Sequence, residues 1–333
     1  MSREIIIAGW GAVSPAGWTA GEMVDAILEK RALPISEESR GSDAPVRRFR
    51  SVPNALAQPP WARHTRLRRA SPATRFAVSA ALEALGSSEI EKETLGVIFV
   101  TMNGSVTFSR RFFAEVCENP ALASPILFPE TVFNAPASHL SSVLASPAVN
   151  YTLLGDSAHF LRGLDLAVQW LHEERVPHCL VVAAEELDWL CTEALMLFPG
   201  GRIAAEGSAA AYLKLGAADA GVRLEQITEA HLMSSQVSRA RAAKKMHAEL
   251  LAQPDSLICD SRCGSAVWDA PESTAWPDAH AHSSAQWLGD GFGVSAGWQS
   301  VLACEMLHRG LGRSAAISAI GCSQQAIGAV VSR

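Results

Sequence analysis

A serine that follows a predicted strand and opens a predicted helix is the residue best placed for nucleophilic chemistry in this sequence. The apolar run from Val149 to Leu154 predicts a strand, and Gly155-Asp156-Ser157 forms a tight turn after it. Apolar residues at helical spacing follow between Phe160 and Leu171, and residues 180–184 have the composition of a buried strand. The chemistry of this unit depends on whether Ser157 can be activated.

The neighbours of Ser157 argue against easy activation. A serine hydroxyl is a far poorer nucleophile than a low-pKa thiol and needs an adjacent base. His159 is two residues along the helix and faces another direction, while the Asp156 carboxylate would repel a forming oxyanion. Asp156 or Ser157 can instead cap the helix, which is a common role for both residue types. The residue types favour a helix cap, and a catalytic serine stays the alternative.

Length and composition predict a large buried core. The chain has 333 residues, of which 48% are apolar and only 19% charged, so much of it must lie inside a fold or an interface. A net charge of −6 points to no nucleic-acid partner. Seven scattered cysteines suit the cytoplasm better than a disulfide framework. We expect no metal site, cofactor, signal peptide or transmembrane segment.

Strands and helices alternate along the chain, which predicts an α/β fold with helices on both sheet faces. We expect a strand at 4–8 and a glycine-rich turn over 9–17. A long helix is expected over 230–251, with Arg239 on its charged face. Glu185 and Glu186 end the central strand, where a structural role is favoured over an acid–base pair.

The order of several short motifs resembles that of the β-ketoacyl synthases, which have the thiolase fold. The matching segments, in order, are IIIAGWGAVSPAG, RRASPATRFAVSAALEALG, LGVIFVTMNG, LFPETVFNAPASHLSSVL, EGSAAAYLKL, SRCGSAVWDAPE, LGDGFGVSAGWQSVL and AIGCSQQAIGAVV. The resemblance covers nearly the whole chain and implies two related α/β halves in a five-layered αβαβα arrangement. We place these halves at 1–186 and 187–333, within one compact unit.

The resemblance fails at the residues that do the family's chemistry. In the family, a cysteine attacks the acyl thioester, and two histidines assist decarboxylation and stabilise the developing enolate. The cysteine position is Ser157 here, the first histidine position is Ser261, and the second falls in 289–292, where we assign it to Phe292. These departures imply a subunit without its own condensing activity. It is closest in character to a chain length factor, a silent partner of an active synthase in polyketide, aryl-polyene or fatty-acid-like biosynthesis.

The resemblance also implies two contact surfaces. Residues 128–139 resemble the family's dimer interface, so Phe133, Asn134 and His139 are candidates for closing the partner's acyl tunnel and limiting product length. Four arginines before the helix at 73–85 could steer an acidic acyl carrier protein, although a solvated loop explains them equally well: Arg63, Arg66, Arg68 and Arg69.

Two other functions stay open. One is an enzyme, a Ser157-dependent acyltransferase, hydrolase or cyclase that acts on acyl thioesters. The other, less favoured, is a homodimeric binding protein for an acyl chain or an aromatic acid. The high apolar content fits all of these, so a covalent acyl adduct on Ser157 would be the distinguishing observation.

Overall fold

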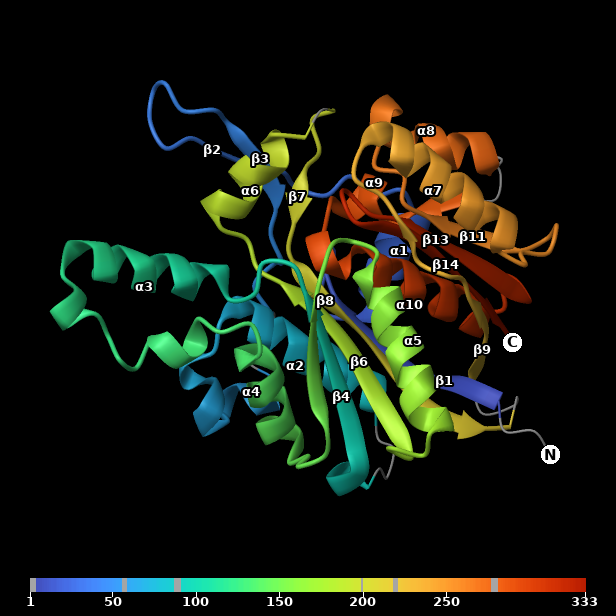
Figure 1. The fold of residues 1–333 in the computed structure, drawn as a ribbon, viewed down its shortest axis with the longest axis horizontal. Coiled ribbons are helices and arrows are strands. Elements are labelled where there is room, and N and C mark those ends of the chain that lie inside the picture. The colour runs from blue at the N-terminus through green and yellow to red at the C-terminus, as the bar shows by residue number, and fades with distance from the viewer. Residues whose placement is uncertain (1–3, 56–58, 87–90, 199, 218–220, 277–280) are drawn as a thin grey trace.

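Two groups of five strands form the frame of the molecule (Figure 1). The computed structural model describes residues 4–55, 59–86, 91–198, 200–217, 221–276 and 281–333. The first group runs in space through β1 (Glu4–Val13), β8 (Gly207–Gly216), β6 (His178–Glu185), β4 (Leu95–Thr101) and β5 (Asn150–Leu154). The second group runs through β9 (Val222–Ile227), β14 (Gln325–Ser332), β13 (Ser314–Ile320), β11 (Leu257–Asp260) and β12 (Ala281–Ser283). The groups meet where β1 pairs with β9.

Helices fill three layers around these strands (Figure 1). The outer face of the first group is covered by α2 (Pro72–Leu85) and α4 (Ala135–Leu144). Between the two groups lie α1 (Ala20–Leu28), α5 (His159–His172) and α10 (Ser295–His308). The outer face of the second group is covered by α7 (Gln236–Glu249), with α8 (Ala266–Ala275) packed beside it. This is the predicted five-layered αβαβα arrangement.

The remaining elements lie at the edges of this frame. The helices are α3 (Val106–Glu118), α6 (Trp189–Met196) and α9 (Ser284–Leu288). The strands are β2 (Ser36–Glu38), β3 (Arg47–Arg50) and β7 (Ala204–Ala205), which form a small sheet, and β10 (His231–Leu232), which pairs with β14. The short 3-10 helices are η1 (Pro60–Arg63), η2 (Thr65–Arg69), η3 (Lys92–Thr94), η4 (Pro120–Leu122), η5 (Phe128–Glu130) and η8 (Phe292–Val294). No helix in the described part of the chain is long and apolar enough to cross a membrane.

The central layer explains why α10 is apolar on nearly every side. A helix that is packed from all directions buries all its faces, and most residues of α10 are buried. Trp298 is fully buried in this helix, and its indole N–H donates to the carbonyls of Val13 and Ser208 at 3.1 Å each. The indole therefore ties α10 to β1 and β8 of the first group.

Two predicted elements have different bounds in the structure. The predicted turn over 9–17 is wrong in its first half, because β1 continues to Val13. Gly9 and Gly11 lie within this strand and leave room for α2, since a Cβ at either would come within 2.2 Å of a helix carbonyl oxygen. The predicted helix over 230–251 begins only at Gln236, because β10 precedes it and Ser235 caps it.

Strand β8 bears on the division of the chain into halves. It follows residue 186 in sequence, yet it lies between β1 and β6 in the first group. The first group is therefore built from residues on both sides of the predicted division between 186 and 187. The boundaries of the halves stay a prediction.

Candidate functional site

The elbow that carries Ser157 lies between β5 and α5 and is held by its neighbour Asp156. Asp156 is fully buried, and its Oδ2 accepts the N–H groups of Ser323 at 3.1 Å and Gln324 at 2.9 Å. Its Oδ1 lies 3.4 Å from the N–H of Ala158, the N-cap of α5. Asp156 thus contacts the backbone at the start of the helix, whereas the side chain of Ser157 does not cap it. The two hydrogen bonds from Ser323 and Gln324 also join the elbow to the β13–β14 loop.

The Ser157 hydroxyl has no base beside it. Among the described residues, none forms a hydrogen bond with this hydroxyl, although the Ser157 carbonyl accepts the N–H of Ala296. The His159 ring binds Gln325 through Nδ1 at 2.9 Å and lies 3.7 Å from Asp156. The Nδ1 atom of this imidazole therefore binds the first residue of β14 and not Ser157.

Ser157 and Asp290 both line two small cavities. The first, of about 20 Å³, has a mixed wall that contains Arg202, Arg239, Ser261, Trp268 and Gln299, and we call it the polar cavity after its two arginines. The second, of about 50 Å³, is mainly apolar and is lined chiefly by Met102, Cys191, Leu195, Phe198, Phe292 and Cys322. The structure therefore brings together the three positions predicted from the sequence, with Ser157 between Ser261 and Phe292.

The hydroxyl of Ser261, at the first histidine position, is bound chiefly by the backbone of β13, and Gln299 Nε2 donates to it at a longer 3.4 Å. Its hydroxyl donates to the carbonyl of Ser318 and accepts the N–H of Ile320, each at 2.8 Å. This hydroxyl joins the end of β11 to β13. Its proton is already donated, so it cannot donate a hydrogen bond to a developing enolate as an imidazole N–H would.

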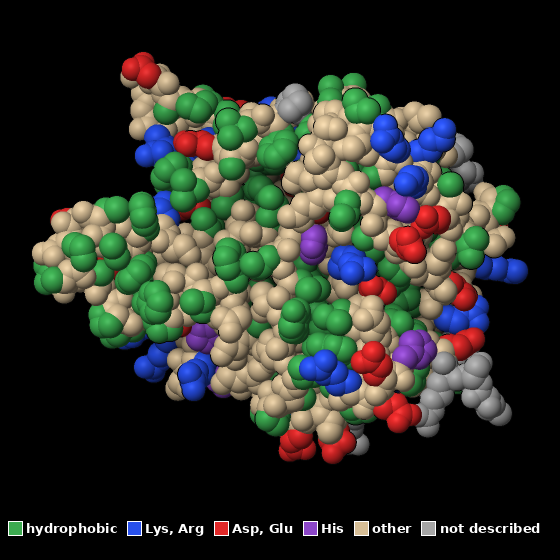
Figure 2. Space-filling model, viewed as in Figure 1, with side chains coloured by type: hydrophobic (Ala, Val, Ile, Leu, Met, Phe, Trp, Pro, Cys, Tyr) green, Lys and Arg blue, Asp and Glu red, His purple; other side chains and the backbone are tan. Residues whose placement is uncertain are grey.

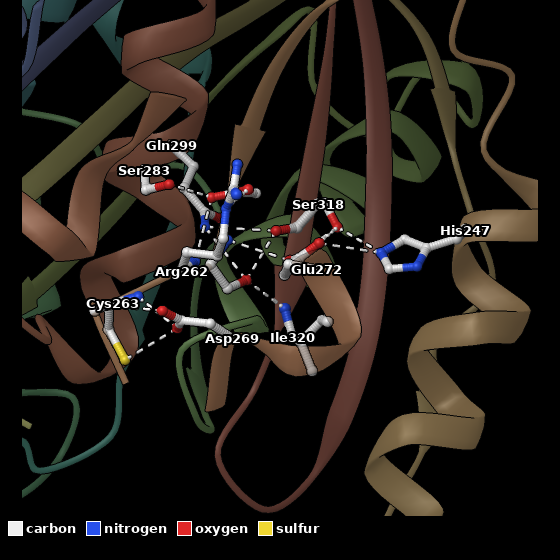
Figure 3. A network of polar contacts seen from close by, with 12 residues as sticks. His247, Arg262, Cys263, Asp269, Glu272, Ser283, Gln299, Ser318 and Ile320 are labelled. Carbon is white, nitrogen blue, oxygen red and sulfur yellow. Dashed lines mark hydrogen bonds and ion pairs between the residues drawn. The ribbon is translucent and has the colours of Figure 1, made fainter. Parts of the chain in front are cut away.

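Behind Ser261 lies a buried polar network centred on Glu272 (Figure 3). Glu272 in α8 accepts from the Ser318 hydroxyl at 2.8 Å and lies 3.1 Å from His247 Nε2 of α7. A serine, a histidine and a carboxylate in contact resemble a hydrolytic set, but Ser318 and Glu272 have no exposed surface. The network holds α7, α8 and β13 together and is closed to substrate.

The segment at the second histidine position, 289–292, contributes two side chains to the cavities: Asp290 lines both, and Phe292 lines the apolar one. Asp290 forms an ion pair with Arg202 and accepts the N–H of Phe292 through Oδ1 at 2.9 Å. Phe292 is buried and has a positive φ of 51°, a backbone region that non-glycine residues rarely adopt. The segment thus places a carboxylate and a phenyl ring where the family has an imidazole.

Two buried arginines are part of the site, and the sequence did not reveal them as such. Arg202 lies before β7, and Arg239, predicted on a charged helix face, is only 3% exposed. Both guanidinium groups pack against the Trp268 ring, at 4.7 and 4.6 Å from its centroid. Burial lowers the pKa of Arg239 to about 10 from 12.5. Helical spacing gave a signal for Arg239, which shares a buried face with Ala242, Ala243 and Met246.

Glu185 and Glu186 bind backbone groups, as expected for structural residues. Glu185 accepts the N–H groups of Met102 and Asn103, and burial raises the pKa of its carboxyl group to about 7. Glu186 accepts the N–H groups of Ala73 at 3.2 Å and Thr107 at 2.9 Å. They bind separate segments, so they do not form an acid–base pair.

The three predicted interface residues lie at the start of α4, outside both cavities. Phe133 is 45% exposed and covers Gly104, where an added Cβ would lie 2.7 Å from its ring. Asn134 is exposed, while His139 is mostly buried and binds Glu130 at 2.8 Å. Their role at a tunnel stays a prediction.

The predicted carrier-docking arginines are all at the surface. Arg63 ends η1, and the other three lie in η2, where the buried Leu67 anchors the segment. All four are exposed, and none forms an ion pair with another described residue: Arg63, Arg66, Arg68 and Arg69. They stay candidates for an acidic partner.

An apolar arm projects from the body of the protein. Helix α3 contains no buried residue, although it carries phenylalanines on one face, and Figure 1 shows it extending away from the strands. Figure 2 shows apolar side chains gathered over this arm. The exposed ones on α3 and the segment after it are Phe113, Leu122, Ile126, Phe128, Val132 and Phe133. Strand β5, at the free end of the first group, adds Tyr151 and Leu154, which are 52% and 48% exposed.

Comparison with known proteins defines the fold. No protein-family model and no curated protein match this sequence. A chain of the ishigamide ketosynthase/chain length factor has a TM-score of 0.83 and 17% identity, covering 99% of both chains. Ketosynthase ApeO in complex with its chain length factor ApeC, from Xenorhabdus doucetiae, gives 0.77 at 12% identity over 99% of this chain and 98% of that chain. AntDE:AntF, a type II PKS acyl-carrier protein in complex with its ketosynthase, gives 0.79 at 14% identity over 100% and 99%. The chain therefore has the ketosynthase fold over its full length, and the predicted thiolase-like fold is confirmed.

Proposed function

We propose that this protein is a ketosynthase-like subunit without condensing activity, which pairs with an active β-ketoacyl synthase as a chain length factor does. The observation that carries the proposal is the apolar arm of α3 and residues 119–133, together with the exposed edge of β5. A helix that buries none of its residues gains little stability from packing within its own chain. An exposed edge strand with apolar side chains is a template for pairing. A partner subunit would cover both.

The chemistry of the site supports the absence of condensation. A hydroxyl without a base, a second hydroxyl bound to backbone groups, and a phenyl ring stand at the three positions of the family's catalytic set. None supplies the thiolate or the imidazole donors that condensation requires. Two of the similar structures are a ketosynthase/chain length factor and a ketosynthase in complex with its chain length factor.

Within such a pair, we assign the limit on product length to the start of α4. Phe133 lies over Gly104, and the adjacent Asn103 lines the apolar cavity, so Phe133 is close to the inside of the subunit as well as exposed. Asn134 would face the partner directly, and His139 would hold the segment through Glu130. The exposed arginines of η1 and η2 would attract an acidic acyl carrier protein. The cysteines are all free, which fits a location in the cytoplasm.

Co-expression with the synthase encoded nearest to this chain tests the proposal. Native mass spectrometry should show a one-to-one complex, and condensation should require both subunits. In that complex, Phe133→Ala should shift the product distribution to longer chains, because a large side chain is removed from the assigned tunnel end. Val237→Ala, at a position 72% exposed on α7, is the matched control. A stable homodimer that ignores the synthase would contradict the pairing, and an unchanged product distribution would contradict the role of Phe133.

The alternative of a Ser157-dependent enzyme rests on one observation. Ser157 lines both cavities and its hydroxyl binds no described residue, so the hydroxyl is free to bind a ligand. Incubation of the purified chain with acyl-carrier-protein thioesters, followed by intact mass measurement, tests this alternative. An acyl adduct that Ser157→Ala abolishes would replace the silent-subunit proposal.

A further inference from the structure

We infer that the polar cavity beside Ser157 binds the carboxylate of a short acyl acid, held by Arg202 and Arg239. The inference does not depend on pairing with a synthase, because every residue that carries it belongs to this chain. It assigns a ligand to a cavity that, without the family's cysteine and histidines, has no catalytic role in condensation.

Arg202 supplies donors that lack acceptors. Its side chain is nine-tenths buried, and one nitrogen pairs with Asp290. Its Nε and Nη1 are completely buried, and neither has a hydrogen-bond partner among the described residues. Buried donors without acceptors are costly, so this arrangement favours a ligand that brings acceptor oxygens into the cavity.

Arg239 supplies a positive charge that no carboxylate pairs with directly. Its guanidinium donates to the carbonyls of Gly321 at 3.3 Å and Trp268 at 3.0 Å, and no described acid forms an ion pair with it. Asp290 pairs with Arg202, whereas no carboxylate in the described part of the chain lies within ion-pair distance of Arg239. A buried charge without an ion partner favours the binding of an anion.

The other acids near the cavity already have donors of their own. Asp156 accepts from the 323–324 backbone, and Asp269 accepts the N–H groups of Cys263 and Gly264. Glu272 is engaged by Ser318 and His247. The two arginines line the cavity, whereas these three carboxylates are engaged by donors of the protein. The Gln299 Oε1 is a buried acceptor without a partner, and it would take a proton donor, either water or a ligand hydroxyl.

The size of the two cavities limits the ligand. The polar cavity of about 20 Å³ has room for little more than one oxygen-bearing group. The apolar cavity of about 50 Å³ is far smaller than the roughly 150 Å³ that holds a benzene molecule. Ser157 and Asp290 line both spaces, so a carboxylate among the arginines would have its tail toward Leu195 and Phe292. A tail of about two or three carbons fits this volume.

Calorimetric titration of the purified chain tests the inference, with propionate as the probe and propionamide as its neutral isostere. Propionate should bind with millimolar affinity, as expected for so few atoms, and propionamide should bind at least about tenfold more weakly. Arg239→Gln should weaken propionate binding by about 10- to 100-fold, whereas Arg241→Gln, at an exposed position on the same helix, should not change it. No saturable binding, or equal binding of propionate and propionamide, would overturn the inference. Absence of saturable binding would mean that water alone fills the cavity, and equal binding would mean that the arginines do not select a carboxylate.

A second measurement covers the case in which Arg239→Gln does not fold. Crystals of the wild-type chain soaked in 3-bromopropionate should show an anomalous bromine peak in the apolar cavity beside Leu195 and Phe292, with the carboxylate toward Arg202. A bromine peak elsewhere, or none at a saturating concentration, would overturn the inference.

Discussion

The free energy of unfolding should fall as the pH rises from about 5 to about 8, and Glu185 should cause a defined part of this fall. Glu185 is fully buried at the end of β6, and burial raises the pKa of its carboxyl group to about 7 from 4.5. Donors on Thr101, Met102 and Asn103 favour the ionised form and lower the pKa, but burial outweighs them.

The sign and the size follow from proton binding. The unfolded chain releases this proton near pH 4.5, whereas the folded chain keeps it until about pH 7. Between these values the folded state binds more protons, so the free energy of unfolding decreases with rising pH and levels off above the folded pKa. At about 1.4 kcal/mol for each pKa unit, Glu185 accounts for a loss of about 3 kcal/mol.

Urea denaturation followed by tryptophan fluorescence across this pH range measures the effect. Glu185→Gln removes the titrating group, so the variant should lose about 3 kcal/mol less than the wild type over the range. Glu93→Gln, at an exposed position, should keep the wild-type dependence. A Glu185→Gln variant with wild-type pH dependence would refute the assigned cause. Glu83, whose pKa burial also raises to about 7, should account for part of the remaining slope.

Two further changes test the core and the proposed interface. Trp298→Phe should lower the free energy of unfolding by about 1–3 kcal/mol, because two buried carbonyls lose their shared donor. Urea denaturation measures this change, and an unchanged stability would contradict the prediction. Phe113→Asp, at a position 68% exposed on the α3 arm, should leave stability within about 0.5 kcal/mol and prevent co-purification with the synthase. Val237→Asp is its control, and equal behaviour of these two variants would argue against the arm as the interface.

Local sequence signals identify two kinds of element: strands that are apolar on both faces, and helices whose ends are set by capping residues. Strand β4 lies in the segment LGVIFVTMNG, where an apolar run buried on both faces is a clear local pattern. The helix expected at 73–85 begins one residue earlier, at Pro72, with Ser71 as its N-cap. The prediction of a turn at Gly9 and Gly11 is wrong, because the close approach of α2 that requires these glycines involves residues about 70 positions away in the sequence.

The candidate site was predictable in its positions but not in its polar contacts. The resemblance located Ser157, Ser261 and Phe292, and the structure places all three around adjoining cavities. Arg202 follows two glycines in a loop without periodicity, so no sequence pattern predicted its burial. Its surroundings depend on Asp290 and Trp268, which only the tertiary fold brings near.

The contacts of the elbow explain how its geometry can persist without a nucleophile. The Asp156 side chain holds the 321–324 loop, where Gly321 leaves no room for a Cβ, since one would lie 2.1 Å from Oδ2. The backbone carbonyl of Ser157 accepts from α10, so the side chain at this position takes no part in either link. Ser157→Cys should therefore leave the stability unchanged. It should not restore condensation, because Ser261 is bound to β13 and Phe292 fills the place of the second imidazole.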